Sequence, residues 1–229
     1  MNAPQTRFDL YAFIHKALRE QMSRTLGQLG RAEPGQPEAL DAVAQLLSAL
    51  RAHLRHENDF VHTAIEARQP GGSRDTADDH VEHLDAIDQL GQELTALRAA
   101  PAAEQAPLMQ RLYRHLAAFI GENLVHMQVE ESQNNARLWA LYSDAELLAI
   151  HERLLASIGP DEMATSLQWM AAALNDAELA MLYGDMQRGA PAEVFPALLG
   201  LAHSQLSAPR QARLNRSLGL APVPGLVSV

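Results

Sequence analysis

Apolar residues recur every three or four positions through residues 8–141, the spacing of one face of an α-helix. No run alternates apolar with polar residues over the length of a strand, and β-branched residues are sparse. Proline and glycine interrupt the pattern near residues 30–37, 70–72 and 101. The pattern therefore predicts four long helices with short connections, which is typical of an up-down-up-down four-helix bundle. The predicted helices span residues 8–29, 38–68, 75–99 and 103–141.

The pattern changes after residue 142, where shorter helices with clear start signals follow. The segment Ser143-Asp144-Ala145-Glu146 matches a capping box, and Asn175-Asp176-Ala177-Glu178 offers similar chemistry. We therefore expect an all-α protein with two parts, a bundle over residues 1–142 and a smaller helical C-terminal portion over 143–229. The last residues, 221–229, are expected to form an extended tail.

Each of the four predicted helices has a core-facing stripe, and each stripe contains polar residues where apolar ones are expected. The stripes are Tyr11, His15, Leu18 and Met22; Leu46, Leu50, His53, Glu57 and Phe60; His80, Leu84 and Ile87; and Leu112, Leu116, Phe119, Asn123, His126 and Glu130.

Two of these helices carry the pattern His-x-x-x-Glu, in the segments HLRHE and HMQVEE. Residues four apart lie on one helix face, roughly 40° apart at about 100° per residue. A buried carboxylate costs several kcal/mol unless a cation compensates it, so two of them among imidazoles point to bound metal ions. A single core histidine bonded to a carbonyl, or a single surface His–Glu pair, is an ordinary structural feature; the joint pattern favours metal. The candidate ligands are His15, His53, Glu57, His80, His126 and Glu130.

Composition limits the other classes of function. The chain of 229 residues carries a formal net charge of −10, which argues against general nucleic-acid binding and adsorption to anionic membranes. It has ten histidines and no cysteine, so disulfides, cysteine–zinc sites and thiol catalysis are excluded and imidazole with carboxylate is left for a transition metal. No signal peptide or membrane span is visible, and we expect a cytoplasmic protein.

The ordered set of residues resembles the hemerythrin-like proteins, the HHE cation-binding domain family. That family has a histidine in the first helix, H-x-x-x-E in the second, a histidine opening the third and H-x-x-x-E-E in the fourth. Here these elements read His15; His53 and Glu57; His80; and His126 and Glu130, over residues 8–142. The resemblance implies a non-haem di-iron centre with two bridging carboxylates that binds or reacts with O₂.

One position departs from the oxygen-carrying members, which have a second histidine four residues after the third-helix histidine. That position is Leu84 here, and His83 is the candidate for an additional ligand. His56, His115 and Glu131 are weaker candidates, and the rival interpretation of each is a solvated residue or an outer partner of a ligand. Tyr11 could tune the site or simply pack in the core. The remaining histidines, His62, His151 and His203, are expected to be structural or surface residues.

The leading hypothesis is a non-haem di-iron protein that binds or senses O₂ or a related diatomic molecule. One alternative is an enzyme, a di-iron oxidase such as a ferroxidase or a peroxide-handling enzyme. The other is a helical interaction protein with a structural metal. Two iron ions are the expected cofactor, with manganese and zinc also compatible with these ligands. A protein partner or homodimer would use the C-terminal helices, and no nucleic-acid or membrane partner is expected.

Overall fold

The computed structural model describes residues 7–221, and every regular element in that range is a helix. The predicted tail lies outside this range except for Ala221. Among the described residues no helix is both long and apolar enough to cross a membrane. The all-α prediction is confirmed.

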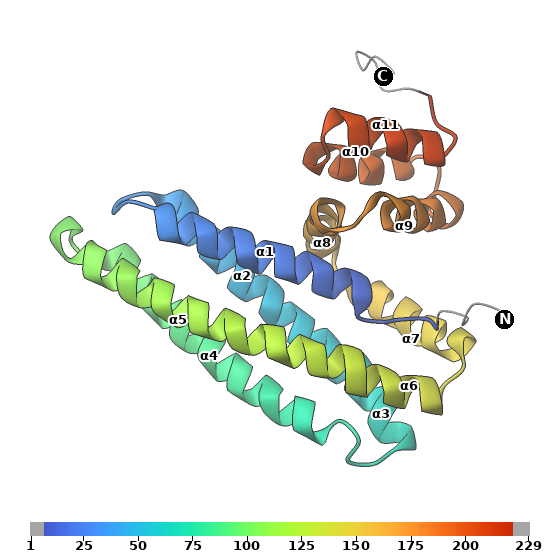
Figure 1. Cartoon of the computed structure of the whole chain (residues 1–229), viewed down its shortest axis with the longest axis horizontal. Helices are drawn as coiled ribbons and strands as arrows, with labels where there is room; N and C mark the ends of the chain where they lie inside the picture. Colours follow the sequence, from blue (N-terminus) through green and yellow to red (C-terminus); the bar gives the residue numbers. More distant parts are fainter. Residues whose placement is uncertain (1–6, 222–229) are drawn as a thin grey trace. The chain divides into compact units, whose positions relative to one another are not determined.

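Four long helical rods make up the N-terminal part (Figure 1). They are α1 (Ala12–Arg31), α2 (Pro37–His56) continued by η1 (Glu57–His62) and α3 (Thr63–Arg68), α4 (Arg74–Ala99), and α5 (Ala102–Val129) continued by η2 (Glu130–Asn134) and α6 (Asn135–Leu141). The first rod begins later than predicted because the Asp9 carboxylate accepts hydrogen bonds from the backbone N–H groups of Tyr11 and Ala12 at 2.9 and 3.1 Å. That carboxylate satisfies amide groups that a helix start leaves unpaired.

The rods are held together by leucine and methionine side chains, most of them on the predicted stripes. Met22, Leu46, Leu112 and Leu116 are 0% exposed, and so is Leu90, which lies three residues after the last predicted stripe position of its helix. Burying side chains of this size stabilises a fold by about 1.5–3 kcal/mol each. This dry core surrounds the polar positions of the stripes.

The helix continuations η1 and η2 are π-helical, and each begins at the glutamate of a His-x-x-x-Glu pair, Glu57 or Glu130. Single π-helical turns inside α-helices are rare and frequently lie at functional sites. The extra residue in the turn shifts the buried face by one position, so Val61 is 2% exposed whereas Phe60 is only half-buried. The prediction that Phe60 continues the stripe is therefore corrected.

Contacts between residues divide the chain into two units, 1–12 with 21–157 and 13–20 with 158–229, and α1 runs without interruption through both. The first unit includes α7 (Asp144–Ser157), whose Leu147 and Ile150 pack with Tyr11 and Ile65. The predicted domain boundary between residues 142 and 143 stays a prediction.

The second unit contains four short helices, α8 (Pro160–Ala173), α9 (Asp176–Gly189), α10 (Phe195–Gln205) and α11 (Ala208–Ser217). Its core is built around Tyr183, Leu179 and Ala202, with Phe13 of α1 packed against it. The capping boxes predicted from sequence are present. Asn175 and Glu178 bond reciprocally at 3.0 Å in each direction, and Ser143 pairs with Glu146 in the same way.

Candidate metal centre

The six predicted ligands lie inside the bundle, and none is more than 9% exposed. They come from all four rods: His15 from α1, His53 and Glu57 from α2 and the start of η1, His80 from α4, and His126 and Glu130 from α5 and the start of η2. Each His-x-x-x-Glu pair stays on one face because the helix is still α-helical up to the glutamate.

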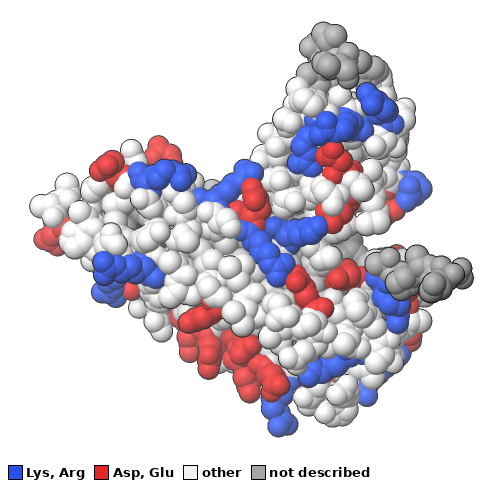
Figure 2. Space-filling view, in the orientation of Figure 1, with Lys and Arg blue, Asp and Glu red and all other residues white. Residues whose placement is uncertain are grey.

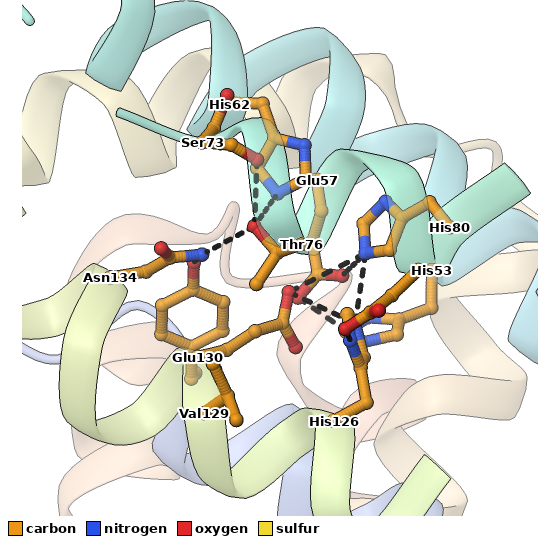
Figure 3. A network of polar contacts seen from close by, with 12 residues as sticks. His53, Glu57, His62, Ser73, Thr76, His80, His126, Val129, Glu130 and Asn134 are labelled. Carbon is orange, nitrogen blue, oxygen red and sulfur yellow. Dashed lines mark hydrogen bonds and ion pairs between the residues drawn. The ribbon is translucent and has the colours of Figure 1, made fainter. Parts of the chain in front are cut away.

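Their donor atoms form two groups, and Figure 3 shows Glu57, His80, His126 and Glu130 of the second group together. One group is His15, His53, Glu57 and Glu130, and the other is Glu57, His80, His126 and Glu130; the donor atoms of each group lie within 4.8 Å of one another. Glu57 and Glu130 belong to both groups. Two imidazoles at each end with two shared carboxylates fit a binuclear metal site.

The half of the site built on α4 and α5 is tightly packed with nitrogen and oxygen atoms. His80 Nε2 lies 3.0 Å from His126 Nε2, 3.5 Å from Glu57 Oε2 and 3.5 Å from Glu130 Oε1. His126 Nε2 lies 3.3 Å from Glu130 Oε1. In the other half, His53 Nε2 lies 3.2 Å from Glu57 Oε1.

The outer nitrogens of two ligands show which ring atoms face the centre. His126 Nδ1 is 3.1 Å from the Asp79 carboxylate, and His80 Nδ1 is 2.8 Å from the Asn58 side-chain oxygen. Both partners are acceptors, so both rings donate through Nδ1–H and a neutral ring then has its lone pair on Nε2. Two lone pairs 3.0 Å apart beside two carboxylates repel each other unless a cation or a proton lies among them. The donor set therefore fits bound metal ions.

The charges of the shared carboxylates show in the pKa of His126. Burial lowers this pKa, but the hydrogen bond and the charge of Glu130 outweigh burial, so the net direction is upward. Without metal, the site thus favours retaining a proton on this ligand. Metal binding has to displace that proton.

His62 was expected to be either a structural or a surface residue, and its burial favours the structural role. It is 5% exposed and its ring stacks on His80 with the ring centroids 4.6 Å apart. Burial, and secondarily His80, lower its pKa to about 4, so the ring is neutral at neutral pH. His62 belongs to neither donor group.

His83, the candidate additional ligand, is buried and meets His126 edge-on with ring centroids 4.8 Å apart. It belongs to neither donor group. Burial, and then His126, lower its pKa to about 4. The neighbouring Leu84 is only half-buried, so His83 takes the interior position that the stripe prediction gave to Leu84.

The weaker candidates lie elsewhere, and none of them is in either donor group. His56 is buried next to the Arg55 guanidinium, and His115 pairs with Glu93 at 3.3 Å. Glu131 is half-buried. The remaining two histidines have other contacts: His151 packs against the Phe8 ring, and His203 bonds to Asn215 at 2.9 Å.

Acidic side chains gather along the outer face of α4 (Figure 2). The exposed members are Asp75, Asp78, Glu82, Asp85 and Asp88, spaced three or four residues apart. A band of one sign attracts counter-ions to the surface beside it. The outer face of α4 is therefore acidic, although Asp88 is paired with Arg51.

Comparison with known proteins agrees with this geometry. The family model described as Hemerythrin HHE cation binding domain matches residues 8–138, more than half of the chain, and all six ligands lie within that range. Searches among curated proteins and among solved structures returned no match. The chain belongs to the hemerythrin HHE family.

Proposed function

We propose that this hemerythrin HHE domain holds two iron ions and binds or senses O₂ or a related diatomic molecule. The observation that carries the proposal is the pair of donor groups that share Glu57 and Glu130. One ion would be held by His15 and His53, the other by His80 and His126, with both carboxylates common to the two.

The remaining residues of the site orient these ligands and exclude water. Asp79 and Asn58 hold the rings of His126 and His80 with Nε2 inward. Both glutamates are buried: Glu130 is 0% exposed and Glu57 is 3% exposed. In such a dry site the charges of the carboxylates act strongly on whatever is bound between them.

Burial supports a small ligand. Because all six side chains are at most 9% exposed, the site suits a molecule of two or three atoms better than an organic substrate. Two iron ions bound there would exchange electrons with O₂, which imidazole and carboxylate groups by themselves do not do. The choice of iron rests on the family; manganese and zinc accept the same ligands.

A second candidate is a di-iron oxidase, such as a ferroxidase or a peroxide-handling enzyme. It is favoured by the number of imidazoles, since each donor group contains two histidines and His83 belongs to neither group. Oxygen-carrying relatives have a fifth histidine at the position of Leu84. Fewer protein ligands leave more positions for water or peroxide.

Anaerobic loading with ferrous iron, followed by exposure to O₂ and then to argon, tests the proposal. We expect charge-transfer bands in the near ultraviolet and visible that appear with O₂ and reverse under argon. His53→Gln should lose them, and His151→Gln, which changes a histidine outside both donor groups, should keep them. Steady turnover of ferrous iron or peroxide would favour the oxidase instead. Iron binding without any response to O₂ would favour a structural metal.

The role of the C-terminal helices α8–α11 is a separate proposal. We suggest that they provide the surface for a protein partner or a second copy of the chain. Sedimentation of the full chain over a range of concentrations tests the second-copy form, because a homodimer gives a concentration-dependent mass.

A further inference from the structure

One face of the candidate ligand His80 is covered by a second imidazole, that of His62. His62 lies in η1, five residues after Glu57, and is 5% exposed. The i→i+5 bonding of a π-helical turn brings residues five apart toward one face, which places His62 inside the bundle. Its ring stacks on the His80 ring with the centroids 4.6 Å apart and the planes 23° apart. Stacked aromatic rings have centroids about 4.5–7 Å apart, so this is a close contact.

The orientation of the His62 ring is itself fixed by a hydrogen bond. Its Nε2 lies 3.2 Å from Thr76 Oγ1. The Thr76 hydroxyl donates to the Ser73 carbonyl at 3.1 Å and accepts from Asn134 Nδ2 at 3.2 Å (Figure 3). Because the hydroxyl proton is used at Ser73, the Thr76 oxygen accepts from His62, whose proton is then on Nε2. Thr76 and His80 are one turn apart on α4, so His62 contacts two successive turns of the same helix.

The plane of the His80 ring needs such a contact. Rotation about the bond between Cβ and the ring of a histidine has broad minima, so the side chain does not set the plane of its own ring. The Nδ1 atom of His80 lies 2.8 Å from Asn58 Oδ1, which is one bond at one edge of the ring. A single bond at one atom tolerates tilting of the ring, whereas a nearly parallel ring in close contact opposes tilting over the whole face. His62 therefore supplies a constraint that Asn58 does not.

We propose that His62 is a positioning residue of the metal centre, whose stacking holds the plane of the His80 ring so that Nε2 points at Glu57 and Glu130. This inference rests on the metal binding in the proposed function. His80 Nε2 lies 3.5 Å from an oxygen of each carboxylate, so the held ring is directed at the two shared ligands. Residues that orient ligating histidines from outside contribute to metal affinity. Burial lowers the pKa of His62 to about 4, so at neutral pH the stacked ring adds no charge beside the metal ions.

The test compares His62→Leu with His62→Phe in the full chain, by anaerobic titration with ferrous iron against a competing chelator. Leucine fills the space without a flat face, and phenylalanine keeps the flat ring without the nitrogens. We expect His62→Leu to weaken one of the two binding steps about tenfold, and His62→Phe to recover most of that loss. The affected step should be the one that Asp79→Asn also weakens, because Asp79 contacts His126 of the same donor group. The control is His151→Leu, which changes a histidine that packs on the Phe8 ring outside both groups, and it should leave both steps unchanged.

A purely structural role gives a different result. Leucine and phenylalanine would then lower the urea stability of the metal-free protein and weaken both binding steps alike. Equal affinities in His62→Leu and His62→Phe, or equal weakening of the two steps, would overturn the inference. If His62→Leu does not fold, Thr76→Val replaces it, since it keeps the shape of the side chain and removes the bond that holds the His62 ring. A smaller loss at the same step is then expected, and wild-type affinity at that step would refute the role. If the wild type binds no iron pair, the proposed function fails and this inference with it, which the iron content of the wild type shows directly.

Discussion

Asp79 offers a sharp test because it contacts one half of the metal centre. Its Oδ2 lies 3.1 Å from His126 Nδ1, and His126 belongs to only one of the two donor groups. The substitution Asp79→Asn keeps an oxygen acceptor of the same shape and removes the negative charge. Asp79→Ala removes the acceptor as well, so the ring loses the partner that holds Nδ1–H outward.

The size of the effect follows from the contact and its exposure. Loss of an outer partner of a ligating histidine typically costs 10–100-fold in metal affinity. The Asp79 side chain is 47% exposed, so water screens its charge and Asp79→Asn belongs at the low end. We expect about a tenfold loss, or about 1.4 kcal/mol, for Asp79→Asn, and nearer a hundredfold, about 2.7 kcal/mol, for Asp79→Ala. Only the ion held by His80 and His126 should be affected.

The assay is an anaerobic titration with ferrous iron against a competing chelator, in which two ions give two binding steps. One step should weaken in the Asp79 variants and the other should keep its wild-type affinity. Asp78→Asn is the matched control. Asp78 is the adjacent, exposed residue on α4, and its substitution changes the net charge by the same amount. The reasoning is refuted if both steps weaken equally, or if Asp78→Asn weakens binding as much as Asp79→Asn.

Further outcomes follow from the same geometry. Glu130→Gln should abolish binding of both ions, because this carboxylate belongs to both donor groups. If elemental analysis finds one ion still bound to the variant, Glu130 is not a shared ligand. His83→Gln should keep two ions per chain, since His83 lies in neither group, and loss of one ion would make it a ligand. Urea unfolding of metal-free protein should show stability falling as pH drops from about 6.5 toward 4, because His62 and His83 have pKa values lowered to about 4 and the unfolded chain binds the protons first. His62→Gln should flatten that dependence, and an unchanged slope would show that the ring is not held neutral.

The four rods could be predicted from sequence because both kinds of signal are local. Glycine and proline mark the connections, and the apolar stripes fix the inward faces, so three of the four rods begin within a residue of the predicted positions. The exception is the first rod, whose start was predicted too early because of Asp9. Its side chain caps the helix from within the predicted range, which only the actual bond to the Ala12 amide reveals.

The inward placement of the six candidate ligands could also be predicted, since each His-x-x-x-Glu pair lies in unbroken α-helix where spacing determines the face. The position of His62 beside the site could not, because His62 follows Glu57 within a π-helical turn. Five residues beyond Glu57, regular α-helix would place His62 about 140° away from it. The i→i+5 bonding of a π-turn instead brings residues five apart toward one face.

Asp79 and Asn58 were missed for a different reason. Each is a polar residue at the edge of the bundle, next to a buried position, and nothing in its spacing separates it from a solvated surface residue. Their role depends on the rotamers of His126 and His80, which are set by packing between rods.

The central claim, a pair of metal ions held by two donor groups with common carboxylates, is tested most directly by counting metal. The full chain is loaded anaerobically with ferrous iron, desalted and measured for iron per chain, beside the double variant His53→Ala with His126→Ala, which removes one ligand from each group. We predict two irons per chain in the wild type and loss of both from the double variant. Iron retained by the double variant at the wild-type level would contradict the site.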